Sequence, residues 1–235
     1  MHQRVREKLA QMGYPVSDKA FEETETQLIN HQQWAKDYPD LEGMEIFSNE
    51  ILTDEYFAYL LLMNEGMGTY DEETWEWSPS SETIYVFDAE FMNVYSMYTE
   101  FLLGVDAIVP DAVFTDIAED LSGMTVEWNM ETGTDGMRSV SFTCNGHPYT
   151  IALTSYGDWL NDEIISFVNE ALEAEGCSGQ LHIVSYPYDQ CIFMIYGSET
   201  EAVTLQLELG IEPVSETIVP ENLPPLVEKI LDFFF

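Results

Sequence analysis

Basic side chains are the scarcest feature of this sequence. Its 235 residues include 7 Lys and Arg against 44 Asp and Glu, which gives a formal net charge of -37. Between Asp37 and Glu228 the one basic side chain is Arg138. Proteins hold nucleic-acid phosphates mainly with Lys and Arg, and a strongly negative surface is repelled by anionic lipids. The composition therefore disfavours nucleic acid and membranes as partners and favours a basic protein.

Cysteines and long apolar stretches are also rare. The three cysteines, Cys144, Cys177 and Cys191, are odd in number and have no C-x-x-C spacing, which indicates reduced, buried thiols. The N-terminal segment has no apolar h-region, so we expect no signal peptide. The longest apolar run, FAYLLLM at residues 57–63, is too short to span a bilayer. These absences predict a cytoplasmic protein.

Apolar and aromatic side chains, by contrast, are plentiful. Hydrophobic residues make up 46% of the chain and aromatic residues 13%. This is enough to form a packed core, so the high charge does not indicate a disordered chain. We expect a folded protein whose surface is strongly acidic.

The first hundred residues are mostly typical of helices. Ser17 is a cap residue before a helix expected over 18–34, which the Tyr-Pro pair after it ends. Apolar residues at helical spacing predict further helices over 53–66 and 94–108. Between them, residues 83–87 (TIYVF) are rich in β-forming side chains and predict a short strand.

From about residue 125 the hydrophobic period changes to that of strands. TVEWNM at 125–130 and SVSFTC at 139–144 alternate inward and outward side chains, and Asn145-Gly146 is a strong signal for a two-residue hairpin turn. An amphipathic helix is expected from a cap at Asn161 or Asp162 to a stop at Gly176.

A second strand pair and a last helix follow. QLHIVSY and QCIFMIY form the pair, and Ser198 is the cap of the helix. The order of elements is therefore ββαββα, which indicates an α+β fold with helices on one face of an antiparallel sheet. We expect a mainly helical region over 1–80 and the sheet domain over 81–235, which ends in a docking helix (ENLPPLVEKILDFFF). One continuous domain is the alternative.

Three stretches of the chain also carry a resemblance. They are VFDAEFMNVYSMYTEFLLGV, VSFTCNGHPYTIALTSYGDWLNDEIISFVNEALEAEG and QLHIVSYPYDQCIFMIYGSETEA, with an F-x-x-N-G-x-x-Y hairpin and a D-W step before a helix. Over residues 85–210 the chain resembles a group of uncharacterised bacterial proteins that are similar to immunity proteins of polymorphic and contact-dependent toxin systems. It departs from them at residues 186–189, where a glycine-rich turn is expected. The resemblance implies a protein that binds one toxin domain and blocks it, and it assigns no binding residues here.

No motif in the sequence predicts catalysis, a metal or a cofactor. Asp116, Glu119 and Asp120 would share one face of a helix, either as an acid/base pair or as a solvated acidic face. There is no EF-hand loop, H-E-x-x-H, P-loop or G-x-S-x-G. Cys144 and His147 flank a tight turn and lack the two further ligands that zinc requires.

One charge in the acidic region needs a partner. Arg138 is the single cation there, and we expect it to form a salt bridge, with Glu127 or Glu131 on the neighbouring predicted strand as candidates.

The candidate partner-binding residues combine acidic and aromatic side chains. Carboxylates pair with a basic partner, and aromatics supply the desolvated centre of an interface. For the tryptophans the alternative is a structural role, in which they join the helical region to the sheet. The candidates are Glu72, Glu73, Trp75, Glu76, Trp77, Asp116, Glu119, Asp120, Asp158 and Trp159.

The sequence thus predicts a non-enzymatic, acidic binding protein that neutralises a basic toxin effector. The toxin domain would be encoded nearby, and the carboxylates would occlude its active site. The main alternative is a structural or regulatory module, such as a DNA mimic or an adaptor. A less favoured alternative is an enzyme that uses a carboxylate pair.

Overall fold

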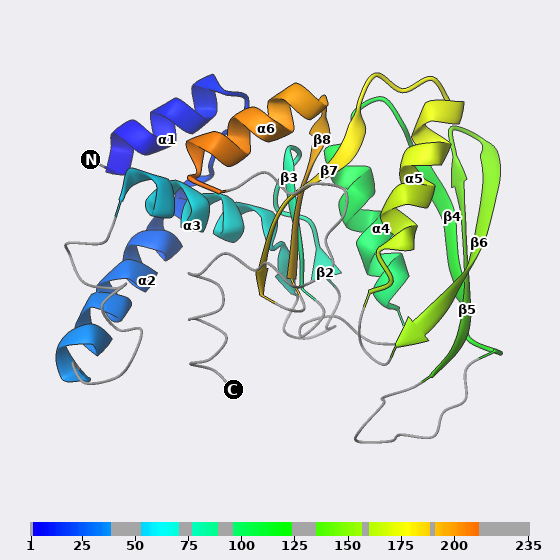
Figure 1. Ribbon diagram of the computed structural model, residues 1–235, viewed down its shortest axis with the longest axis horizontal. Helices are drawn as coiled ribbons and strands as arrows, with labels where there is room; N and C mark the ends of the chain where they lie inside the picture. The colour runs from blue at the N-terminus through cyan, green and yellow to red at the C-terminus, as the bar shows by residue number, and fades with distance from the viewer. Residues whose placement is uncertain are drawn as a thin grey trace.

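The computed structural model describes residues 2–38, 53–70, 77–88, 96–123, 135–156, 160–188 and 191–211. The helices (Figure 1) are α1 (His2–Gln11), α2 (Asp18–Asp37), α3 (Asp54–Gly66), α4 (Met97–Ile108), α5 (Glu163–Ala174) and α6 (Glu199–Glu208). The strands are β1 (Thr69–Tyr70), β2 (Trp77–Ser78), β3 (Ile84–Asp88), β4 (Phe114–Asp120), β5 (Asp135–Cys144), β6 (His147–Tyr156), β7 (Gln180–Tyr188) and β8 (Cys191–Gly197).

Three helices begin at hydroxyl cap residues, of which the sequence predicts Ser17 and Ser198. The side chain of Ser17 accepts a hydrogen bond from the Ala20 amide at the start of α2, and that of Thr53 caps α3 in the same way. At α6, Ser198 and Glu201 form a reciprocal capping box. Each cap satisfies a backbone N–H that the first turn of a helix leaves without an acceptor.

The β5–β6 hairpin forms where Asn145-Gly146 predicts it. Cys144 pairs with His147 across the turn, and the register continues residue by residue to the far end of both strands. Asn145 has φ of 49° and Gly146 has φ of 87°. A two-residue turn requires positive φ at both positions to match the twist of the strands, and Asn-Gly tolerates it best.

Two three-stranded antiparallel sheets organise the molecule. One has the order β3-β8-β7 and the other β4-β5-β6, and β1 and β2 form a separate short pair. In Figure 1, α4 and α5 lie between the two sheets, and α1, α3 and α6 lie on the far side of the β3-β8-β7 sheet. The layers are therefore helix, sheet, helix, sheet.

Each face of the β3-β8-β7 sheet belongs to a different apolar core. Ile84 and Val86 of β3 point toward the core shared with α1, α3 and α6, whereas Tyr85 and Phe87 point toward the core shared with α4 and α5. Gly104 allows α4 to approach this second face, because a methyl group there would overlap the ring of Tyr85. A strand buried on both faces carries a nearly continuous run of apolar side chains, as residues 84–87 of β3 and 191–196 of β8 do.

The structure confirms the expected α+β class and the ββαββα order of the C-terminal half. It adds that the two hairpins belong to separate sheets. Among the described residues, helices cover one face of the β4-β5-β6 sheet, as expected, whereas the β3-β8-β7 sheet is covered on both faces.

The N-terminal helices share their core with later parts of the chain. Val5 and Leu9 of α1 and Phe57 of α3 pack in the same cluster as Phe193 of β8 and Leu205 of α6. The expected strand at 125–130 and the expected docking helix at 221–235 lie outside the described residues.

Candidate functional site

Charge is distributed unequally between the two ends of the described structure. Of the described basic residues, all except Arg138 lie on α1 and α2, and most are matched there by acids. Arg6 lies 2.7 Å from Asp18, and Lys19 lies 3.8 Å from Glu23. Helices α1 and α2 together carry five Lys or Arg against six Asp or Glu, whereas α3 and α6 beside them carry only acidic charges.

The opposite end carries negative charge almost alone. We call α4, β4, β5, β6 and α5 the acidic half. Arg138 is its one Lys or Arg among the described residues, and this side chain is 1% exposed. The exposed carboxylates of the acidic half and the loops next to it are Asp111, Asp116, Asp120, Asp162, Glu163, Glu170 and Glu173. A partner that approaches this end therefore meets a field of one sign.

The outer face of the β4-β5-β6 sheet is the part of the acidic half on the side away from the helices. Strand alternation places Ser139, Ser141 and Thr143 of β5 on this face, because Val140, Phe142 and Cys144 point into the core. Their β6 neighbours are Pro148, Thr150 and Ala152. The side chains on this face are thus small and uncharged, and most of them are polar.

Acidic side chains border this face along β4. Asp116 lies at an irregularity in the β4–β5 register, has φ of 50°, and accepts a hydrogen bond from the Thr143 hydroxyl at 3.1 Å. Asp120 is exposed, and the hydrogen bond from the Ser122 amide holds its pKa below the usual range. Both carboxyl groups are exposed to solvent. They form what we call the β4 acidic edge.

The third acid of this group, Glu119, points the other way. The expectation that Asp116, Glu119 and Asp120 share a helix face is wrong, because the segment is strand β4, in which neighbouring side chains alternate. The Glu119 side chain is 3% exposed and lies 3.2 Å from the Arg138 guanidinium. Glu119 is therefore unavailable to a partner.

The buried Glu119–Arg138 pair has a structural role that the sequence only partly predicts. Glu119 also accepts a hydrogen bond from the Thr99 amide at 2.7 Å, and so caps the start of α4 from another element. The guanidinium lies 5.3 Å from the centre of the Tyr98 ring. Burial raises the pKa of Glu119, and the contacts with Thr99 and Arg138 offset part of that shift.

A salt bridge at Arg138 is thus confirmed, but its partner in the described structure lies on β4. Glu127 and Glu131, the acids expected to pair with it, lie outside the described residues.

Trp77 is the one described member of the expected aromatic site around residue 75. It is 6% exposed, its indole N–H donates to the Met67 carbonyl at 3.0 Å, and its ring lies 5.4 Å from that of Tyr85. This corrects the prediction of a surface role: Trp77 joins the end of α3 to the core between the sheets. The remaining predicted binding residues, Glu72, Glu73, Trp75, Glu76, Asp158 and Trp159, lie outside the described residues.

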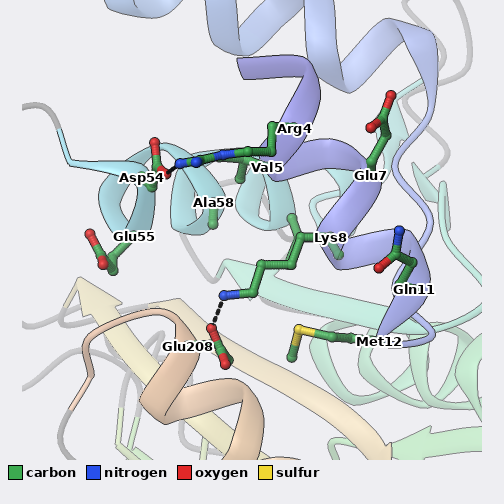
Figure 2. A pocket seen from close by; sticks show the side chains of 11 residues that line it. Arg4, Val5, Glu7, Lys8, Gln11, Met12, Asp54, Glu55, Ala58 and Glu208 are labelled. Atoms are coloured by element: carbon green, nitrogen blue, oxygen red, sulfur yellow. Dashed lines mark hydrogen bonds and ion pairs between the residues drawn. The ribbon is translucent and has the colours of Figure 1, made fainter. Parts of the chain in front are cut away.

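A second candidate site is a cleft at the helical end, between α1, α3 and α6. It has a volume of about 440 Å³, and Arg4 and Lys8 of α1 extend into it. Figure 2 shows that Arg4 reaches Asp54 of α3 and that Lys8 reaches Glu208 of α6. Both cations are thus paired with carboxylates of the chain itself. These two ion pairs hold α1 against α3 and α6. They also occupy the two cations that would otherwise bind an anionic ligand.

Two further acids of the acidic half are held by tyrosines. Glu175 accepts a hydrogen bond from the Tyr149 hydroxyl at 2.6 Å and lies 3.0 Å from the His147 ring. The Tyr196 hydroxyl donates to Asp111, which also accepts from the Ser178 amide at 2.7 Å. These bonds fix the loops at the ends of α5 and α4.

Neither a metal centre nor a membrane span is found among the described residues. No group of three or more His, Cys, Asp or Glu side chains is placed to hold a metal ion in that part of the chain. No helix within it combines the length and the apolar character needed to cross a bilayer.

Comparison with protein-family models, with curated proteins and with solved structures gives no match to this chain. Its own residues are therefore the basis for its proposed function.

Proposed function

We propose that this protein is an acidic binding protein that neutralises a basic effector, such as a toxin domain encoded nearby, by covering its active site in the cytoplasm. It acts by association and has no reaction of its own. The observation that supports this proposal is the charge distribution: the exposed Asp and Glu side chains of the acidic half have no exposed Lys or Arg beside them within the described structure.

The physical reason is that such a surface speeds encounter with a basic cleft. Complementary fields raise association rate constants from about 10⁵–10⁶ M⁻¹s⁻¹ toward 10⁸ M⁻¹s⁻¹ or more at low salt. A face of small Ser, Thr and Ala side chains then permits close approach, with Met137, which is 47% exposed, as an apolar contact on it. An inhibitor benefits from both effects, because it has to reach the effector before the effector reaches its target.

The experiment compares two variants that each lose two negative charges. In the first, Asp116→Asn and Asp120→Asn neutralise the β4 acidic edge. In the second, Glu22→Gln and Glu23→Gln neutralise exposed acids of α2 at the helical end. Stopped-flow association with the product of the adjacent gene is measured at about 20 and 500 mM salt, which places the Debye length near 20 Å and near 4 Å.

We expect the β4 variant to associate several-fold more slowly than the wild type at low salt, and the difference to shrink at high salt. The α2 variant should associate at close to the wild-type rate. Equal slowing in both variants would show that net charge, and not the β4 acidic edge, determines the association rate. Absence of binding at low salt would contradict the proposed function.

A further inference from the structure

Strand β6 has a second edge that the rest of the described structure does not use. In the β4-β5-β6 sheet it is the last strand, and it pairs only with β5 within the described residues. An open strand edge presents backbone N–H and C=O groups at regular spacing, and these can bind a further strand.

Two features of the β5–β6 hairpin show which residues face this edge. Cys144 and His147 flank a two-residue turn and therefore form a hydrogen-bonded pair, after which the pattern alternates along the strands. On β5, the amides of Asn145 and Met137 bond toward the β4 side, to Val113 and Gly123, as the same alternation requires. The β6 residues that bond to β5 are thus the odd-numbered ones.

The even-numbered residues of β6 direct their backbone groups to the open edge. Pro148 has no backbone N–H, and it lies where a missing N–H costs no hydrogen bond to β5. Strands tolerate proline at such edge positions. The Thr154 carbonyl accepts a hydrogen bond from the Asn161 side chain at 3.1 Å, from outside the sheet. The groups that remain are the C=O of Pro148, the N–H and C=O of Thr150 and of Ala152, and the N–H of Thr154.

The surface beside this edge has an apolar centre. Tyr149 and Ile151 of β6 and Phe167 of α5 pack on the core between the sheets but are only partly buried. The rings of Tyr149 and Phe167 lie 6.3 Å apart in an edge-to-face arrangement. An added strand would point every second side chain toward these residues and would cover them.

Two carboxylates flank this apolar centre. Glu163 precedes Phe167 by four residues and Glu170 follows it by three, so both lie near it on the same side of α5, and both are exposed. They are about 10 Å apart along the helix axis. In an extended strand, side chains four residues apart are separated by about 13 Å, which long Lys or Arg side chains can adjust to fit.

We infer that the edge of β6 binds an extended strand of the basic partner, with the inward pattern basic–x–apolar–x–basic. The inference rests on the proposed function for the identity of the partner. Backbone hydrogen bonds to Thr150 and Ala152 hold the strand, the apolar side chain covers Phe167, and the basic ones meet Glu163 and Glu170. A second copy of this chain fits less well, because β6 has no Lys or Arg to offer and the acids of α5 would face each other.

The first test uses a peptide probe, acetyl-Thr-Lys-Thr-Val-Thr-Lys-Thr-amide, and amide hydrogen exchange followed by NMR at low salt. Peptide at saturation should slow exchange at Thr150 and Ala152 by about 10-fold or more, while Ile151 and Leu153, which already bond to β5, change little. A version with Glu in place of both Lys should not bind. Three results would each overturn the inference. They are Thr150 and Ala152 amides that are already protected without peptide, protection at another site, and no binding at millimolar peptide.

The second test replaces Ala152, whose N–H faces the edge. Ala152→Pro removes that donor without removing a bond to β5 and should weaken peptide binding about 5-fold or more. Ala152→Thr keeps the donor and should bind as the wild type does. The circular dichroism spectrum and melting temperature of both variants check that the fold is retained.

A comparison of the wild type with Ala152→Pro separates this inference from the proposed function. If the adjacent gene product binds the wild type and Ala152→Pro equally tightly, the proposed function stands and the strand-addition inference fails. If that product binds neither while the peptide protects Thr150 and Ala152, the edge binds strands and the proposed partner is wrong.

Discussion

The buried pair of Glu119 and Arg138 yields the most quantitative prediction. Their side chains are 3% and 1% exposed, so solvent does not screen the interaction appreciably. Glu119→Ala leaves the Arg138 guanidinium without this carboxylate and deprives the Thr99 amide of its acceptor. Removing one partner of a buried pair costs about 3–5 kcal/mol of unfolding free energy.

Urea unfolding followed by tryptophan fluorescence measures this loss, and thermal unfolding should show a decrease of about 10 °C for a chain of this size. The matched control is Asp120→Asn, one residue along β4 and exposed, which should change stability by less than about 0.5 kcal/mol. In the double variant Glu119→Leu with Arg138→Met, much of the lost stability should return, because two apolar side chains need no ion pair at this position.

A loss below about 1 kcal/mol in Glu119→Ala would refute the reasoning. It would mean that the guanidinium finds water or another acceptor once Glu119 is gone. A double variant less stable than Glu119→Ala would refute it in a different way, since loss of the carboxylate beside the buried guanidinium would then not be the main cost.

Two further predictions concern packing and pH. Gly104→Ala should destabilise the protein by about 1–3 kcal/mol in urea unfolding, because the added methyl group overlaps the buried ring of Tyr85. Hydrogen bonds from Tyr149 and then His147 hold the pKa of Glu175 below its ordinary value. The stability from this shift is complete above the unfolded pKa of about 4.3 and is lost as pH falls through the lower folded pKa. In urea titrations, Glu175→Gln should therefore be less stable than the wild type at pH 6, with a smaller difference below pH 4; a constant difference would contradict this.

Local signals in the sequence predict the parts of the fold that a few neighbouring residues determine. Ser17 and Ser198 cap helices, and Asn145-Gly146 forms the hairpin turn. Each of these features is satisfied within three or four residues of itself. Tertiary contacts have little influence on such choices, so the sequence is sufficient to predict them.

Strand β4 shows why other parts could not be predicted. Its sequence, FTDIAED, is rich in residues that disfavour strands, and Asp116 has a positive φ. Pairing with β5, some twenty residues later in the chain, is what makes it a strand. The direction of Glu119 depends on that register, so the sequence predicts a partner for Arg138 but does not identify which acid it is.

Helix α1 was not predicted, although a signal for it exists. Val5 and Leu9 are four residues apart and are both buried against α3 and α6. The segment is short and begins without a cap residue, so its apolar stripe gains its stability from packing more than from its own propensity. The division of the described structure into two sheets likewise depends on long-range pairing.

The central claim is that the acidic half, and not the net charge of the chain, mediates association with a basic partner. The most direct measurement is the low-salt association rate of the Asp116→Asn, Asp120→Asn variant against that of the Glu22→Gln, Glu23→Gln variant, with the adjacent gene product. These variants have the same net charge and differ in which end of the molecule is neutralised. The account predicts a several-fold slower rate for the first variant and a nearly unchanged rate for the second. Equal rates for the two variants would contradict it.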